Sequence, residues 1–153
     1  MKTVLTLTLL ALLGTTPAPV PYPEGYRGWS HVKSTLIGPT HPRYATWGGY
    51  QHIYANTLAM EGYRTRSFPE GSVIVLDWVL AQETNGMTVE TGHRQLDVMV
   101  KDSTKYAASG GWGFQRFMGT SRTELSTTLT PPQCFGCHQN LGKDGLVLSH
   151  YRE

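Results

Sequence analysis

The sequence predicts an α+β fold made mainly of an antiparallel β-sheet of about five strands, with a few short helices. Asn85-Gly86 separates two runs rich in β-branched residues, which is a strong hairpin signal because both central positions of a type I′ turn need positive φ. The other apolar runs are short and alternate instead of repeating at helical spacing. Charged residues make up only 16% of the chain beside 17 glycines and 9 prolines, which favours a turn-rich fold over a long helical bundle.

The length of 153 residues suits a single domain preceded by an export signal. Residues 1–20 are interpreted as a secretory signal peptide, with Lys2 before an apolar run and small residues after it. That run is too short to span a bilayer comfortably, and an uncleaved N-terminal anchor is the alternative interpretation. Either way, the folded domain at residues 21–153 is expected outside the cytoplasm. A formal charge of +2 is too small to indicate a nucleic-acid partner.

Before the hairpin, the sequence predicts one strand and one helix. Residues 50–54 are aromatic and β-branched and predict a strand, with Tyr50, His52 and Tyr54 on one face and Gln51 and Ile53 on the other. Asn56 is placed to cap a helix over residues 58–63. The remaining segments are predicted as a linker at 19–23, either a short helical turn or irregular chain at 26–35, a loop at 38–42 and a turn at 68–71.

The hairpin itself joins predicted strands at residues 72–80 and 89–100. Strand alternation places Ile74, Leu76, Trp78 and Leu80 on one face of the first strand. In the second strand it separates Gln95, Asp97 and Met99 from Leu96, Val98 and Val100. After the hairpin we expect a short helix capped by Asp102 and ending at Ala108, a strand at 112–117 and a final short strand at 146–148.

The most informative motif is Cys134-Phe-Gly-Cys137-His138, near the C-terminus. Two thiols at this spacing can add to the two vinyl groups of one haem, and the histidine that follows can ligate the iron. The pattern is typical of a c-type haem attachment site, and it uses both cysteines of the chain. A zinc site would need a second pair of Cys or His ligands at recognisable spacing, and the chain has no second Cys pair. A thioredoxin-like redox pair would need a preceding βαβ pattern, which the sequence does not show. We therefore predict one haem c, attached through Cys134 and Cys137, with His138 as the metal ligand.

Five segments together resemble the cytochrome P460 family. They are residues 22–29 (Tyr-Pro-Glu-Gly-Tyr-Arg-Gly-Trp), 68–75 (Phe-Pro-Glu-Gly-Ser-Val-Ile-Val), 96–103 (Leu-Asp-Val-Met-Val-Lys-Asp-Ser), 111–114 (Gly-Trp-Gly-Phe) and the haem motif. The resemblance runs over about residues 22–152. It implies a five-stranded antiparallel sheet with helices, a homodimer, a periplasmic location, and a five-coordinate haem iron with an open distal side.

The family resemblance implies two alternative functions. Cytochromes P460 oxidise hydroxylamine and carry a bond from a lysine to the haem edge, whereas the related cytochromes c′-β lack this bond and bind nitric oxide. Aligning the turn at residues 68–71 places Leu76 at the lysine position, and leucine has no nitrogen to attach. The distal carboxylate of the P460 branch falls on Asp97, and its distal arginine falls near Gln51. These matches favour the c′-β branch and a distal side lined by Leu76.

Several further residues are candidates for contact with the haem. Asp97 is a possible distal acid or base, with a solvated strand residue as the alternative. Trp112 and Phe114 are expected to pack in the core or on the haem, and so is Trp47. Met99 is a possible sixth ligand of the iron, although a methionine in such a position more often fills a gap in the core. Of the other histidines, His52 is the first to check, because its strand lies near the aligned distal region.

These observations favour a periplasmic haem protein that binds NO, CO or related small ligands, in a scavenging, buffering or sensing role. The alternatives are a P460-type oxidoreductase acting on hydroxylamine or NO, a haem peroxidase that uses Asp97, and a plain electron carrier. Each of these functions would involve a redox partner that the sequence does not identify. In all of them the protein supplies the axial imidazole, the distal sterics and the local polarity.

Overall fold

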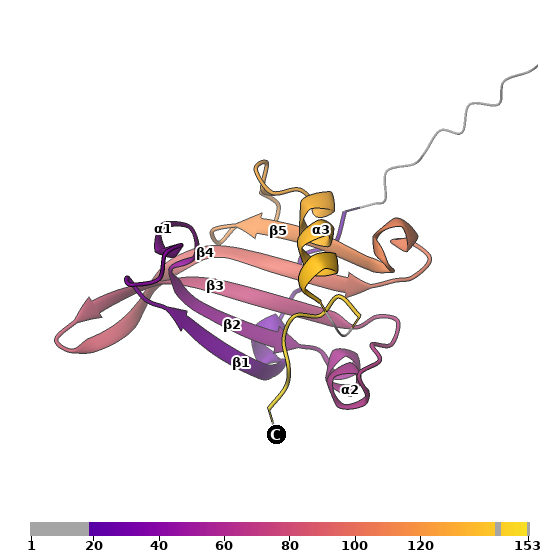
Figure 1. The fold of residues 1–153 in the computed structure, drawn as a ribbon, viewed down its shortest axis with the longest axis horizontal. Helices are drawn as coiled ribbons and strands as arrows, with labels where there is room; N and C mark the ends of the chain where they lie inside the picture. Colours follow the sequence, from indigo (N-terminus) through magenta and orange to yellow (C-terminus); the bar gives the residue numbers. More distant parts are fainter. Residues whose placement is uncertain (1–18, 143–144, 153) are drawn as a thin grey trace, which may run out of the picture.

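Five antiparallel strands, paired in chain order, form the sheet on which the rest of the chain is built (Figure 1). The computed structural model describes residues 19–142 and 145–152. The strands are β1 (Ser30–Ile37), β2 (Gly49–Ala55), β3 (Val73–Thr84), β4 (Met87–Lys101) and β5 (Trp112–Met118). The helices are α1 (Tyr44–Trp47), α2 (Thr57–Thr65) and α3 (Pro131–Leu141), with short 3₁₀ turns η1 (Tyr26–Gly28) and η2 (Ala107–Ser109). The predicted fold class is confirmed.

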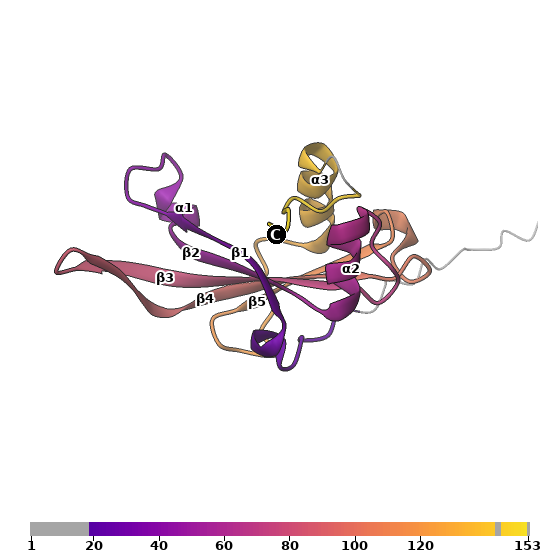
Figure 2. The same ribbon diagram turned by 90° about the horizontal axis from the view of Figure 1, so that it is seen from below.

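The two faces of the sheet carry separate cores. Figure 2 shows α1 and α3 on one side, here called the helix face, and η1 on the other, the opposite face. The helix-face core contains Val32, Ala55, Ala59, Ile74, Met99, Trp112, Phe114 and Val147. The opposite-face core contains Val20, Tyr26, Val75, Leu96, Val98, Tyr106 and Phe117. The predicted alternation along β4 is confirmed, because Met99 belongs to the first core and Leu96 and Val98 belong to the second.

Local signals in the sequence account for the hairpin and for α2. Asn85 and Gly86 have φ of 50° and 76°, as a type I′ turn requires, and β3 and β4 pair along their length up to it. The Asn56 side chain accepts a hydrogen bond of 2.9 Å from the Ala59 amide and caps α2 as predicted. Among the described residues, no helix is long and apolar enough to cross a membrane.

The structure corrects three local predictions. Most of the segment 26–35, left open between a helical turn and irregular chain, belongs to edge strand β1, which runs over residues 30–37. Its polar composition and single buried residue, Val32, hid its alternation. Asp102 caps only a turn, by accepting from the Lys105 amide, before η2. The strand predicted at 146–148 is wrong, because Leu146 lies in a turn with φ of 73°.

The haem motif lies on α3, a helix that the sequence analysis did not predict. Pro131 occupies its first turn, where a missing N–H costs nothing. The Thr130 amide donates 2.9 Å to Gln133 Oε1, the return arm of a capping box. The pattern Thr-Pro-Pro-Gln is therefore a sequence signal for the N-terminus of a helix.

The N-terminal end of the described chain packs on the sheet. Val20 is 3% exposed in the opposite-face core, so the segment predicted as a linker at residues 19–23 lies against β5 and its neighbours. Most of the predicted signal peptide, residues 1–18, lies outside the described residues.

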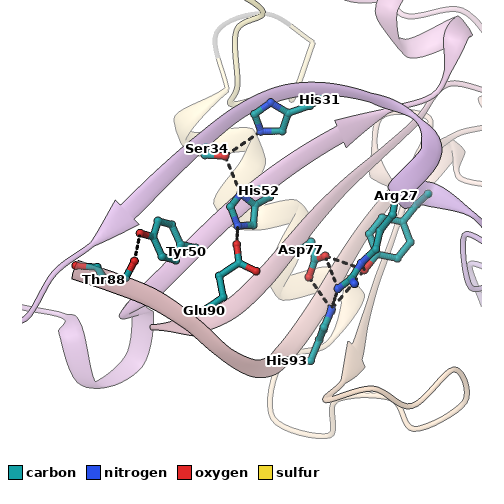
Figure 3. Close-up of polar contacts among 10 residues, drawn as sticks. Arg27, His31, Ser34, Tyr50, His52, Asp77, Thr88, Glu90 and His93 are labelled. Atoms are coloured by element: carbon teal, nitrogen blue, oxygen red, sulfur yellow. Dashed lines mark hydrogen bonds and ion pairs between the residues drawn. The ribbon is translucent and has the colours of Figure 1, made fainter. Parts of the chain in front are cut away.

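A buried carboxylate anchors η1 to the opposite face (Figure 3). Asp77 on β3 is 2% exposed and accepts a 2.8 Å hydrogen bond from the Tyr26 hydroxyl. Arg27 donates to the same oxygen at 3.3 Å, and His93 Nε2 lies 3.0 Å from the other. Burial, and then the bond to Asp77, raise the pKa of Tyr26, so its hydroxyl remains a donor.

A bulge in β4 brings His93 into this cluster. Gln95 pairs with Trp78 and His93 pairs with Val79, so Arg94 is an extra residue between them. The extra residue reverses the alternation and turns His93 toward Asp77. Strand patterns alone would have placed His93 with Gln95 on the helix face.

We expect Tyr26→Phe to lower the free energy of unfolding by about 1–3 kcal/mol, because it leaves a buried carboxylate with one donor fewer. Chemical denaturation at neutral pH, followed by tryptophan fluorescence, measures this change. Tyr22→Phe is the matched control, since the Tyr22 ring packs on Phe117 and its hydroxyl makes no hydrogen bond among the described residues. Equal effects of the two variants would contradict the assigned role of the Tyr26–Asp77 bond.

Candidate haem-binding site

Two adjoining cavities lie between α3 and the helix face of the sheet. The first, of about 400 Å³, is lined by all three residues of the attachment motif, Cys134, Cys137 and His138. The second, of about 300 Å³, extends toward β1. Their shared lining residues are Gln51, Leu76, Asp97, Met99 and His138. Together they form a trough with His138 on one side and Leu76, Asp97 and Met99 on the other, within the size range of small-molecule sites.

The His138 imidazole is oriented by a backbone contact. Its Nδ1 lies 2.7 Å from the Leu146 carbonyl oxygen, which can only accept, so Nδ1 carries the proton and donates. In the neutral ring Nε2 is then the unprotonated nitrogen, and it makes no hydrogen bond among the described residues. Metal-ligating histidines usually donate their other ring N–H in this way, which fixes the tautomer and raises ligand basicity.

The turn that supplies this carbonyl is tightly packed against the end of α3. The Gly142 amide donates 2.8 Å to the His138 carbonyl oxygen. A Cβ at Gly142 would lie 2.6 Å from that oxygen and 2.8 Å from Leu146 Cα, so only glycine fits without a shift. Gly142 therefore allows the Leu146 carbonyl to lie within hydrogen-bond distance of the imidazole.

Both thiols line the first cavity, but their environments differ. Cys134 is half-buried, and this burial, followed by the negative charge of Asp97, raises the pKa of its thiol to about 11. Cys137 is exposed one turn later on the same helix. Without haem, Cys134 is therefore a protonated thiol at neutral pH.

These features fit a c-type haem. Two free thiols and one imidazole with an available Nε2 line a single trough. The ring centroids of Phe114 and His138 lie 5.0 Å apart. Leu76, Met99 and Phe114 add apolar surface of the kind that a porphyrin plate buries. Cys134, Cys137 and His138 would hold the group, as the sequence analysis predicted.

Leu76 on β3 and Asp97 on β4 are cross-strand partners, and both line the trough. Asp97 is not isolated, however. Arg116, its partner on β5, donates bidentate hydrogen bonds of 2.5 and 2.6 Å to its two oxygens. Burial alone would lower the pKa of Arg116, but the hydrogen bonds and charge of Asp97 raise it above the ordinary value. Arg116 was not among the predicted site residues, although its position on the predicted strand 112–117, on the face of Trp112 and Phe114, was a usable signal.

The other predicted candidates divide between the trough and its surroundings. Phe114 and Met99 line the trough, and so does Trp47 at its α1 end. Trp112 does not line either cavity; it packs beneath them in the helix-face core against Phe68. Its contact with haem therefore remains a prediction that this placement does not favour.

The histidines other than His138 line neither cavity. His52 is on the opposite face, where its ring nitrogens lie 2.7 Å from Ser34 Oγ and 2.7 Å from Glu90 Oε1 (Figure 3). The alternation predicted for residues 50–54 is thus confirmed, because Gln51 and Ile53 line the cavities instead. Of the six histidines, all among the described residues, only His138 lines either cavity.

The trough is also lined by an amine that was not among the predicted site residues. Lys33 on β1 lines the second cavity, two strands away from Leu76. It was missed because residues 26–35 were not assigned to a strand. It does not lie at position 76, where the family resemblance predicts the cross-linking residue and this chain has leucine.

We expect Gly142→Ala to lower the free energy of unfolding by about 1–3 kcal/mol, since the new methyl group forces the turn away from His138. Thermal or chemical denaturation measures the loss, and absorbance of the haem-loaded protein reports any change at the axial histidine. Gly136→Ala on the same helix is the control, because a Cβ there meets nothing within 4 Å. A neutral Gly142→Ala would show that the turn does not constrain the imidazole.

Comparison with known proteins agrees with this geometry. The family model described as Cytochrome P460 matches residues 23–149, which include all five strands and the whole of the trough's attachment motif. No curated protein matches this chain. Family membership implies a c-type haem, in accord with the two thiols and the oriented imidazole. On the extent of this match, the chain belongs to the cytochrome P460 family.

Proposed function

We propose that this chain is a c-type haem protein whose iron is five-coordinate and binds small neutral gases such as nitric oxide or carbon monoxide. The observation that carries the proposal is the wall opposite His138, where Leu76 and Met99 line the trough and no second histidine does. An imidazole on one side and an aliphatic side chain on the other leave one coordination position available to an external ligand.

Each residue of the attachment motif has a defined task in this proposal. Cys134 and Cys137 hold one haem through two thioether bonds, and His138 Nε2 ligates its iron. The haem, when bound, supplies the ligand-binding and redox chemistry. The Leu146 carbonyl keeps the imidazole in the ligating tautomer, which favours a firm bond between His138 and the iron.

The residues across the trough set which ligands are favoured. Leu76 presents aliphatic surface, which disfavours water and charged ligands but admits neutral diatomic gases. Both oxygens of Asp97 accept hydrogen bonds from Arg116, so the carboxylate is already engaged within the protein. The absence of a lysine at position 76 removes the cross-link that hydroxylamine oxidation requires in the P460 branch.

An enzymatic function is the second candidate, and one observation favours it. An acid and an arginine, Asp97 and Arg116, line the same trough as His138. Such a pair can hold and orient a protonated substrate, as a hydroxylamine or NO oxidoreductase, or a peroxidase, would need. A plain electron carrier is less favoured, because it gains nothing from a vacant ligand position.

The cellular setting follows from the same proposal. Attachment of haem c is an export-side process in bacteria, so we place the mature domain in the periplasm, after removal of the export signal that precedes the packed segment at Val20. We also propose that it acts as a homodimer and exchanges electrons with a redox partner. NO, CO or related small ligands are its proposed binding partners.

Titration of the ferrous holoprotein with NO, without oxygen, tests the proposal. We expect a saturable change in absorbance at one NO per haem, and no turnover when hydroxylamine and an electron acceptor are added. Leu76→Ala should raise the association rate about tenfold, equivalent to about 1.4 kcal/mol off the barrier, because it shortens the aliphatic side chain over the ligand position. Leu36→Ala, at a 43% exposed residue lining neither cavity, is the control. Sustained hydroxylamine oxidation would favour the enzyme instead.

Met99→Leu separates an open iron from one ligated by a thioether. Leucine conserves volume and apolarity, so we expect less than about 1.5 kcal/mol loss of stability and an unchanged absorbance spectrum. If Met99 Sδ were the sixth ligand, the variant would lose a low-spin spectrum and gain NO affinity. That outcome would contradict the five-coordinate assignment.

A further inference from the structure

Lys33 is a cation in the trough with no partner among the described residues. It lines the second cavity and makes no hydrogen bond or ion pair there. The only other lysine or arginine in the two linings, Arg116, is paired with Asp97. The trough therefore holds one uncompensated positive charge, at its β1 end.

The strand register places this charge far from the two thiols. Lys33, Ile53, Leu76, Asp97 and Arg116 are successive cross-strand partners and form one row across the helix face. At about 4.8 Å per strand, Lys33 lies roughly 10 Å from Leu76 along this row. Cys134 and Cys137 line only the first cavity, together with Arg116. Lys33 and the thiols thus lie at opposite ends of the trough. His138 and Leu76 line both cavities and lie between them.

The chemistry of haem determines what reaches the Lys33 end. Its two vinyl groups, which receive the thiols, lie on adjacent pyrroles, and its two propionates lie on the other pair. Fixing the vinyl edge at Cys134 and Cys137 directs the propionate edge away from them. Ionised carboxylates then arrive where the trough carries an unpaired ammonium group.

We propose that Lys33 forms an ion pair with a haem propionate. This inference rests on the proposed haem attachment and goes beyond it by assigning the opposite edge of the cofactor. Thr35 and Ser149 line the same cavity and offer hydroxyl groups for further hydrogen bonds. Ser149 Oγ is itself held 2.6 Å from the Tyr63 hydroxyl, which fixes its position.

The ion pair has a measurable consequence for the iron. A positive charge near the haem favours the ferrous form, because the ferric form carries one more positive charge. Lys33 therefore raises the reduction potential. Since the Lys33 side chain is exposed, added salt should weaken the effect.

Redox titration of the holoprotein tests the assignment. We expect Lys33→Gln to lower the reduction potential at low salt, Lys33→Arg to retain the wild-type value, and the Lys33→Gln shift to shrink at high salt. Lys105→Gln is the control with the same loss of charge, since Lys105 stacks on the Tyr106 ring and lines neither cavity. Equal shifts in Lys33→Gln and Lys105→Gln, or none in either, would overturn the proposal.

Two further readouts separate the possible failures. Mass spectrometry of the digested holoprotein should recover Lys33 unmodified, and a Lys33 peptide covalently attached to haem would overturn the ion pair. Haem content and NO titration of wild-type protein test the proposed function separately. Loss of NO binding would refute that function while leaving the salt-dependent shift of Lys33→Gln intact.

Discussion

The hydrogen bond from His138 Nδ1 to the Leu146 carbonyl is the contact on which the site depends. It joins α3 to the turn that follows the helix, fixes the imidazole tautomer and leaves Nε2 without a partner among the described residues. The bond requires Leu146 to lie close to the last turn of α3. The absence of a side chain at Gly142 and the positive φ of Leu146 make this close packing possible. The proximal side is thus prepared by backbone geometry as much as by the attachment motif.

The opposite wall shows how the sheet divides polar and apolar contacts. On the helix face, one row runs from Lys33 through Ile53 and Leu76 to the ion pair of Asp97 and Arg116. Apolar surface lies at the centre and charge at both ends. A haem likewise combines a central apolar plate with charge at its margin, although its propionates lie at one edge only. This match between the row and the cofactor links the fold to the proposed ligand chemistry.

Much of this architecture was predictable from local signals. Asn85-Gly86 identified the hairpin, alternation placed Asp97 and Met99 on one face of their strand, and residue spacing predicted the attachment site. The missed features depend on tertiary contacts. β1 has a single buried residue, so its pairing with β2 leaves little trace in its composition. The bulge at Arg94 turns His93 to the other face, which alternation cannot anticipate.

The candidate site was predicted on its proximal side and only partly on its distal side. Cys134, Cys137 and His138 are set by covalent spacing, which sequence displays directly. Asp97 was found, but its pairing with Arg116 depends on the register between β4 and β5. Lys33 reaches the trough only because β1 closes the far edge of the sheet. A resemblance over about residues 22–152 did not replace this register information.

The coordination state of the ferrous iron in the ligand-free protein tests the central claim most directly. Resonance Raman spectroscopy or magnetic circular dichroism at neutral pH distinguishes the possible states. We predict a five-coordinate, high-spin iron bound by one imidazole. A six-coordinate, low-spin iron with a second protein ligand would contradict the account.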